Sequence, residues 1–383
     1  MRRLLFALAL GACTDPGASP PDTEGTPDAT VARPSSRAAD AARKLGLQPN
    51  FLIGLGNDQQ DAAFNLGQRL DIRYRYLVRS GSQGWPDWNT GGGFVTRTAQ
   101  AARSNGAVPM YTLYELAAQG DGNTSITEDR SYMSLFWADV ALLFDKLREF
   151  DSPAIVHFEP DFWAYAQQKS NGNPTAMKAE VRIAPDCSDL SDDLAGFGRC
   201  LVSMARKRAP KVLVGFHAST WGAYTNGRPD GFAVGRFLNE VGAGEADFFA
   251  IDMLDRDAGC FEVQGPNCQR RGSGWYWDET NRQSPNFHDH LAWATKVREA
   301  LPLPILWWQL PLGVPSDTPG GTPGTYRDNR VRYIFSHPDE FAAAGGLGAC
   351  FGTGAGGQTT VTTDGEQFRN ALQAYRAGPT PLP

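Results

Sequence analysis

Acidic side chains end several short apolar runs of this sequence, and aromatic side chains stand beside them. The run IVHFEPDFW carries Glu159 and Asp161, FFAIDMLDRD carries Asp252 and Asp255, and MYTLYE ends at Glu115. In glycoside cleavage, one carboxylic acid protonates the leaving oxygen while a carboxylate activates water or attacks the anomeric carbon. These five carboxyl groups are therefore the candidate catalytic residues.

Glu159 is the candidate general acid. A two-residue strand period places it on the same side as His157 and Asp161. Its immediate neighbours are Phe and Pro, and apolar surroundings raise the pKa of a carboxyl group, as an acid catalyst requires. The alternative is a structural glutamate paired with Arg75 or Arg79.

Asp252 is the candidate base or nucleophile, because a lone Asp after an apolar strand is costly to bury without a partner. It could instead accept a hydrogen bond from a Tyr or an Arg inside the fold. Asp255 and Glu115 compete for the same role, although Asp255 also suits a turn.

Aromatic and polar side chains near these carboxyl groups are the candidate sugar-binding residues. Aromatic faces stack on sugar rings while polar groups meet the hydroxyls. Trp307 and Trp308 are adjacent, so we expect one to line the site and the other to pack against helices. His217 could orient a carboxylate or be a core histidine. The full candidate set is Tyr111, Trp163, His217, Trp221, Trp307, Trp308 and Gln309.

The sequence lacks the motifs that are typical of other kinds of active site. The sequence has no CxxC or HxxxH metal spacing, no Gly-x-Ser-x-Gly elbow and no third Gly after Gly54-x-Gly56. We therefore expect no cofactor and no metal. A metal-dependent hydrolase that uses His157, His217 and the Asp cluster as ligands remains an alternative.

Eight strand-like runs alternate with helical patterns, which predicts an α/β fold: a (β/α)8 barrel with enlarged βα loops over residues 48–378. A doubly wound open sheet is the alternative. In such a barrel the chemistry gathers where the strands end. The expected strands are Asn50–Gly56, Leu70–Arg79, Val108–Leu116, Ala154–Glu159, Val212–Ser219, Phe248–Met253, Pro304–Leu310 and Gly346–Gly352.

An acidic residue at the end of the fourth of eight strands resembles the (β/α)8 glycoside hydrolases. In their retaining superfamily a Glu ends strand four, as Glu159 does here, and a nucleophilic Glu ends strand seven. This chain has Gln309 on strand seven and Phe158 in place of the Asn before the Glu, so that mechanism does not carry over. The Glu-Pro-Asp string at 159–161 is similar to one in inverting cellulases, and Ile251-Asp252-Met253 resembles chitinase-like and lysozyme-like barrels.

The N-terminus predicts export. Two Arg, a short apolar run and small residues at 1–12 have the order of a signal peptide, and Leu-Gly-Ala-Cys resembles a lipobox that would lipidate Cys13. Residues 13–47 are rich in Pro, Ser and Thr, which predicts a disordered tether. A bacterial cell-envelope lipoprotein or a secreted protein is expected, with any membrane contact made through Cys13.

Cysteine spacing agrees with an oxidising compartment. Cys187 and Cys200, and Cys260 and Cys268, are the expected disulfide pairs, while Cys350 is expected to be a buried free thiol.

Composition limits the partners. The net charge is −6 and the pI is about 5.5, which disfavours nucleic acid. The sequence predicts a monomeric glycosidase acting on a polysaccharide or oligosaccharide, such as a β-glucan or a cell-envelope glycan. A non-catalytic glycan-binding lipoprotein on the same barrel is the second interpretation.

Overall fold

The computed structural model describes residues 36–56, 59–80, 83–120, 122–315 and 320–383. The expected signal peptide at 1–12, the lipidation site Cys13 and the tether as far as residue 35 lie outside these ranges.

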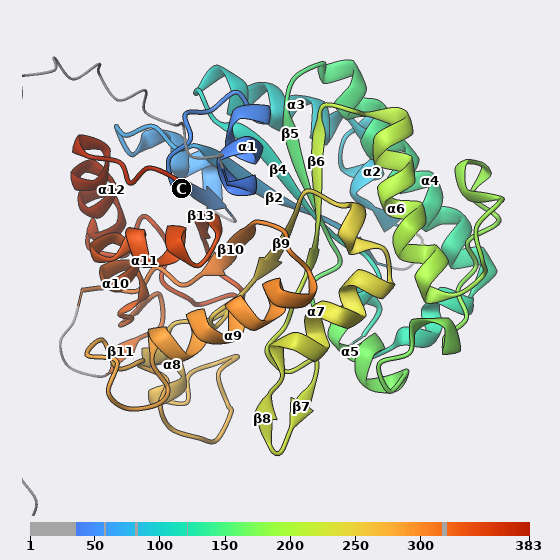
Figure 1. Cartoon of the computed structure of the whole chain (residues 1–383). Coiled ribbons are helices and arrows are strands. Elements are labelled where there is room, and N and C mark those ends of the chain that lie inside the picture. The colour runs from blue at the N-terminus through green and yellow to red at the C-terminus, as the bar shows by residue number, and fades with distance from the viewer. Residues whose placement is uncertain (1–35, 57–58, 81–82, 121, 316–319) are drawn as a thin grey trace, which may run out of the picture. The chain divides into compact units, whose positions relative to one another are not determined.

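Eight parallel strands in the described residues form a closed barrel (Figure 1). Strand β1 pairs with both β2 and β13, which closes the sheet. Each strand coincides with one that the sequence predicts, so the (β/α)8 fold is confirmed. The strands are β1 (Leu52–Gly56), β2 (Ile72–Ser80), β4 (Val108–Tyr114), β5 (Ala154–Phe158), β6 (Val212–His217), β9 (Phe248–Ile251), β10 (Ile305–Leu310) and β13 (Gly346–Phe351).

Most of the strands are short, apolar and buried along their whole length, as β6 (VLVGFH) illustrates, whereas β2 (IRYRYLVRS) carries arginines and is partly exposed. Parallel strands need this continuous hydrophobicity because helices cover one face and the barrel interior covers the other. At Gly215 a Cβ would stand 2.5 Å from the ring of Phe248 on the neighbouring strand, so only glycine fits there.

Helices pack around the barrel between the strands. The longest, α4 (Arg130–Phe150), begins where the carboxylate of Asp129 accepts the backbone N–H groups of Ser131 and Tyr132. Its buried stripe faces the sheet. The other covering helices are α3 (Gly93–Ser104), α6 (Leu194–Arg208), α7 (Gly231–Glu240), α9 (Phe287–Ala300), α10 (Arg330–Ser336), α11 (Pro338–Ala343) and α12 (Gln367–Ala377).

The expected tether at 13–47 ends earlier than predicted, because helix α1 (Arg37–Lys44) packs against the barrel. Its alanines at 38, 39, 41 and 42 are buried, and Arg37 donates to the carbonyl of Pro302 just before β10. Small side chains let a helix approach closely, so an Ala-rich segment that reads as disordered buries a face here.

Short elements follow the C-terminal ends of the strands and enlarge the loops there. Figure 1 shows α8, β11 and the β7–β8 hairpin together at the lower end of the view. These elements are β3 (Gln83–Gly84), α2 (Trp85–Trp88), α5 (Phe162–Lys169), β7 (Tyr224–Thr225), β8 (Arg228–Pro229), α8 (Ala258–Glu262), β11 (Gly321–Thr322) and β12 (Thr325–Tyr326).

Both expected disulfides are present, Cys187–Cys200 beside α6 and Cys260–Cys268 after β9. Cys350 on β13 is a buried thiol. No helix within the described ranges combines the length and the hydrophobicity needed to cross a bilayer.

Candidate active site

A cavity of about 590 Å³ opens at the C-terminal ends of the barrel strands. We call it the barrel cavity. Its walls come from β2, β4, β6 and β10 and from the loops that follow β5, β6, β9 and β13. The lining residues are Tyr76, Tyr114, Asp161, Tyr165, His217, Thr220, Trp221, Asp252, Met253, Leu254, Asp255, Arg256, Arg270, Trp308, Gln309 and Gly354.

Trp308 lines the barrel cavity and is only 3% exposed. Its ring centroid lies 5.6 Å from that of Tyr76, 4.8 Å from that of His157 and 5.6 Å from that of His217. This packing fixes the side chains that stand above it, since neighbouring rings leave little room for other rotamers.

A hydrogen-bonded chain rises from the barrel interior to Asp252. His157 Nε2 lies 3.2 Å from His217 Nδ1, and His217 Nε2 lies 3.4 Å from Asp252 Oδ1. Burial lowers the pKa of His157 well below its usual range, with the neighbouring His217 adding to the effect. A neutral His157 can donate to His217 Nδ1, which leaves His217 Nε2–H to donate to the carboxylate.

Asp252 is the ionised carboxylate of the barrel cavity. Burial acts to raise its pKa, but the hydrogen bond and charge of His217, together with the charge of His290, outweigh burial and leave the pKa below its usual value. Asp252 is thus negatively charged over a wide pH range.

Asp255 has the opposite tendency. Burial raises its pKa and the negative charge of Asp252 adds to the rise, while the charges of Arg256 and Arg270 oppose it. Arg256 Nη1 lies 2.9 Å from Asp255 Oδ2. Two carboxyl groups of one cavity therefore titrate apart, which is the environment of an acid and a base with separate roles.

Asp161 is the third carboxyl group of the barrel cavity. It directly precedes α5, and the hydroxyl of Tyr114 donates to its Oδ2 at 3.4 Å. Burial raises the pKa of Tyr76 well above its usual value, and the charges of Asp161 and Asp255 contribute. Tyr76 thus stands within electrostatic reach of both aspartates.

Strained backbone borders the barrel cavity. Asp161 and Gln309 have positive φ angles of 68° and 56°, in the left-handed region that non-glycine residues seldom adopt. Gln309 donates from Nε2 to the hydroxyl of Tyr76. Strain of this kind concentrates at functional sites, where surrounding contacts hold it in place.

Aromatic rings form one wall of the barrel cavity. Tyr165 and Trp221 meet edge to face with their centroids 4.6 Å apart. Tyr165 lies in the first turn of α5, and its backbone N–H donates to the carbonyl of Asp161 at 3.2 Å. Gln168 holds the loop by donating to the carbonyl of Trp221 at 2.6 Å. The wall offers apolar surface to a ring-shaped ligand.

Glu159, the candidate general acid, does not line the barrel cavity. The strand alternation stops at Phe158, and the positive φ of Glu159 turns its fully buried carboxylate toward the end of β4. There it accepts the backbone N–H groups of Glu115 and Leu116 at 3.0 Å. Burial raises the pKa of Glu159 to about 8, against the opposing effect of these backbone bonds.

Glu115 also lies away from the barrel cavity. Its fully buried side chain accepts Trp85 Nε1–H at 2.9 Å and lies 3.7 Å from Arg79 Nε. Arg79 in turn donates from Nε to Asp139 at 2.7 Å. Burial raises the pKa of Glu115 well above its usual range, and the charges of Asp139 and Glu159 add to the rise. Its surroundings are those of a structural residue.

Three expected sugar-binding aromatics pack in the core instead. Trp163 is 1% exposed and donates to the carbonyl of Phe158, and Trp307 is fully buried and donates to His290 Nε2. Tyr111 faces α3, where its hydroxyl donates to the carbonyl of Val95. Of the adjacent tryptophans, therefore, Trp308 lines the cavity and Trp307 packs outward.

The structure brings together Asp161, His217, Trp221, Asp252 and Asp255, with Trp308 and Gln309, as expected. It adds side chains that the sequence analysis did not select. The i, i+4 spacing from Asp161 could have identified Tyr165, but nothing local marks Arg270, which a disulfide brings to the cavity. The added residues are Tyr76, Tyr114, Tyr165, Arg256 and Arg270.

Among the residues that the structure describes, no group of three His, Cys, Asp or Glu side chains is arranged to hold a metal ion. The ring nitrogens of His157 and His217 point at each other, and His217 also points at Asp252.

Comparison with known proteins supports the fold. No family model matches the sequence, and no curated protein does. Among solved structures, a modular endo-β-1,4-mannanase from Cellulomonas fimi is 12% identical, with 90% of this chain and 75% of that chain covered and a TM-score of 0.53. A double mutant of the Cellulomonas fimi endo-β-1,4-mannanase is 13% identical, with the same coverage and a TM-score of 0.50.

D-Psicose 3-epimerase from Clostridium cellulolyticum H10 is also similar, at 12% identity, with 85% of this chain and 98% of that chain covered and a TM-score of 0.42. The likeness to the two mannanase structures, at 12% and 13% identity, shows the (β/α)8 barrel alone, a fold that hosts many chemistries. Function must therefore be argued from the barrel cavity.

Proposed function

We propose that the protein hydrolyses glycosidic bonds in a polysaccharide or oligosaccharide, with Asp252 as base or nucleophile and Asp255 as general acid. The observation that carries this proposal is the opposite pKa shift of two carboxyl groups in one cavity. Glycoside cleavage needs one ionised and one protonated carboxyl group on either side of the scissile bond. Asp161 is the alternative acid.

The histidine chain gives Asp252 its orientation. His217 donates to one carboxylate oxygen, so the other can face the anomeric carbon or a water molecule. The wall of Tyr165 and Trp221 offers apolar surface to the C–H face of a sugar ring. Tyr76, Tyr114 and Gln309 supply hydroxyl and amide groups for the sugar hydroxyls.

Reducing-sugar release from a polysaccharide panel tests the proposal. The panel contains β-mannan, β-glucan, chitin, galactan and polygalacturonate, each with and without a chelator. We expect turnover of at least one substrate that is insensitive to chelator and is lost in Asp252→Asn. Activity that depends on added metal would favour the metal-dependent hydrolase instead.

A glycan-binding protein without catalysis is the second candidate. Gln309 favours it, because strand β10 presents an amide where retaining barrel hydrolases carry their nucleophile. On this alternative, wild type releases no sugar from any substrate, and Asp252→Asn binds glycan as tightly as wild type does.

We also propose export and lipidation at Cys13. The two disulfides are compatible with an oxidising compartment. Mass spectrometry of the membrane fraction tests this proposal: a diacylglyceryl group on Cys13 is the expected result, and an intact residue 1–12 segment would contradict it.

A further inference from the structure

Arg270 reaches the barrel cavity from the segment after β9. Within this segment, Cys260 and Cys268 form a disulfide that closes a loop, which we call the cystine loop. Arg270 follows two residues later, and its backbone N–H donates to the carbonyl of Cys268 at 2.8 Å. Gln264 Nε2 donates to the carbonyl of Arg270 at 3.0 Å. The backbone at Arg270 is therefore fixed from both sides.

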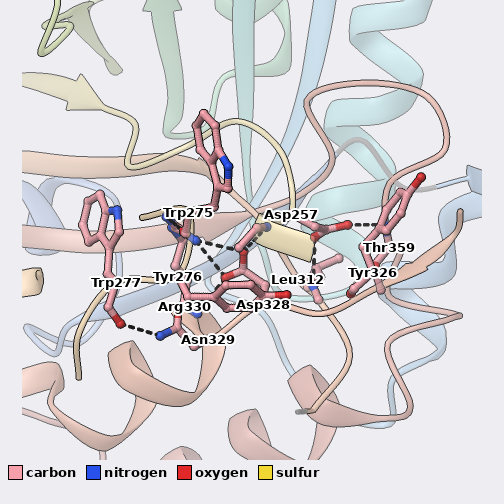
Figure 2. Close-up of polar contacts among 12 residues, drawn as sticks. Asp257, Trp275, Tyr276, Trp277, Leu312, Tyr326, Asp328, Asn329, Arg330 and Thr359 are labelled. Atoms are coloured by element: carbon pink, nitrogen blue, oxygen red, sulfur yellow. Dashed lines mark hydrogen bonds and ion pairs between the residues drawn. The ribbon is translucent and has the colours of Figure 1, made fainter. Parts of the chain in front are cut away.

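The cystine loop is anchored to the barrel by buried polar groups. Gln358 Nε2 lies 3.2 Å from the sulfur of Cys260, and Gln358 Oε1 accepts the backbone N–H of Asp257. The carboxylate of Asp257 accepts the backbone N–H groups of Gly313 at 3.2 Å and Thr359 at 2.7 Å. Figure 2 shows Asp257 between these segments. The loops after β9, β10 and β13 thus form one unit.

A buried ion pair between Asp328 and Arg330 also holds the segment that follows β9. Arg330 Nη1 lies 2.8 Å from Asp328 Oδ2, and Asp328 also accepts the backbone N–H of Ala258 at 2.7 Å. Arg330 Nη2 donates to the carbonyl of Trp275, and Asn329 donates to that of Trp277 (Figure 2). The segment from 258 to 277 is therefore a rigid support rather than a loose loop.

An aromatic pair on this support orients the Arg270 side chain. The guanidinium carbon lies 5.4 Å from the ring centroid of Phe261. Phe261 stacks on Trp275 with a centroid distance of 4.4 Å. A cation above an aromatic face is attracted by the ring and loses little of its capacity to donate hydrogen bonds.

The two arginines of the barrel cavity differ in their partners. Arg256 forms an ion pair with Asp255. Arg270 has no carboxylate within 4.0 Å among the residues that the structure describes, yet its charge acts on Asp255. A positioned guanidinium in a polar cavity is suited to a planar anion, which it can bind through two N–H groups.

We propose that the glycan bound in the barrel cavity carries an anionic group, a uronate carboxylate or a sulfate ester, and that Arg270 binds it. This inference rests on the proposed function for the identity of the ligand as a glycan. The ionised carboxylate of Asp252 repels such a group from its own side of the cavity, so the group lies beside Arg270 and the sugar to be cleaved lies over Asp252.

Calorimetric titration tests the proposal with two matched probe pairs. One pair is an oligogalacturonide and its carboxyl-reduced form, and the other is a sulfated galactan oligosaccharide and its desulfated form. The titrated proteins carry Asp252→Asn to prevent turnover, with and without Arg270→Gln. Arg271→Gln is the matched control, because Arg271 is also exposed but lines a separate surface hollow with Trp275 and Tyr276.

We expect wild-type Arg270 to bind the anionic member of one pair about 10- to 100-fold more tightly than its neutral form, the value of a charged hydrogen-bonded contact. Arg270→Gln should abolish that preference, while Arg271→Gln should keep it. The pair that shows the preference identifies carboxylate or sulfate.

Equal affinity for both members of each pair, binding to none of the four probes, or an anion preference that survives Arg270→Gln would overturn the inference. The proposed function is judged separately from turnover. Turnover confined to neutral glycans would retain the hydrolase and reject the role of Arg270. Binding of an anionic probe through Arg270 without turnover of any glycan would support the role of Arg270 and reject the hydrolase.

Discussion

The carboxyl groups at the ends of β4 and β5 and those after β9 occupy equivalent places in the barrel but meet opposite surroundings. Glu115 and Glu159, the sealed pair, are fully buried and bonded to backbone N–H groups, Trp85 and Arg79. Asp252 and Asp255, the open pair, line a cavity.

The difference shows that a strand-end position does not by itself make a carboxyl group catalytic. In the sealed pair both pKa values are raised, so burial favours the protonated form of both groups. The pair therefore does not combine an ionised carboxylate with a protonated carboxyl group. In the open pair the pKa values move apart. The partners of each carboxyl group decide its role.

The largest expected effect is that of Asp252→Asn. Removing the ionised carboxylate should lower kcat/KM about 10³-fold or more, because it eliminates the base or nucleophile. The unfolding midpoint in urea should stay close to that of wild type, since the side chain is partly exposed. A variant with more than a tenth of wild-type activity would contradict the role of the open pair.

Asp255→Asn should reduce activity about 10²-fold and change the pH profile. The pKa of Asp252 is lowered and that of Asp255 is raised, so the active form, with Asp252 ionised and Asp255 protonated, is populated between the two values. Activity should therefore peak at acidic pH and fall as Asp255 loses its proton. The variant should lack this alkaline limb in a plot of kcat/KM against pH.

If the alkaline limb persists in Asp255→Asn and disappears in Asp161→Asn, the acid is Asp161. Both variants leave Asp252 and the sealed pair in place. This outcome would therefore replace Asp255 by Asp161 as the general acid and leave the role of Asp252 unchanged.

The sealed pair should affect stability instead. Glu159→Ala should lower the free energy of unfolding by about 2–4 kcal/mol, because it leaves the buried N–H groups of Glu115 and Leu116 without an acceptor. Activity per folded molecule should be unchanged. Urea denaturation with the activity of the remaining folded protein measures both quantities.

Glu159 should also make stability depend on pH. Its pKa is about 8 in the folded protein, against 4.5 as the ordinary value, so the unfolded chain releases this proton first. Stability from this group is complete below pH 4.5 and is lost as the pH rises toward 8. Glu159→Gln should flatten this part of the stability profile.

The smallest effect is expected at the aromatic wall. Trp221→Ala should raise KM about 5-fold with little change in kcat, because stacking on a sugar is worth about 1 kcal/mol. Trp163→Phe is the matched control, since Trp163 lies in the core and should leave KM unchanged. Equal KM values for Trp221→Ala and Trp163→Phe would contradict the proposal that Trp221 binds the substrate.

The sequence predicted the barrel well because its signals are local. Short, continuous apolar runs such as VLVGFH fit buried strands better than helices because of their length, and their spacing leaves room for one helix each. The opposite directions of Trp307 and Trp308 likewise follow from strand alternation alone.

The sequence did not predict the position of a side chain where that position depends on a single backbone angle or on a contact between distant segments. The two-residue period predicts that Glu159 and Asp161 lie on the side of His157, but β5 ends at Phe158 and both residues have positive φ angles. Arg270 reaches the barrel cavity only because a disulfide and the contacts of Asp257 fold its loop back onto the barrel. Neither feature is marked by composition or periodicity.

A direct comparison of Asp252→Asn with Glu159→Gln tests the central claim, that the open pair and not the sealed pair performs the chemistry. Both changes replace one carboxyl group by an amide of the same size. Sugar release at acidic pH, corrected for the folded fraction, should be lost in Asp252→Asn and preserved in Glu159→Gln. Loss of activity in a fully folded Glu159→Gln, with Asp252→Asn active, would contradict the account.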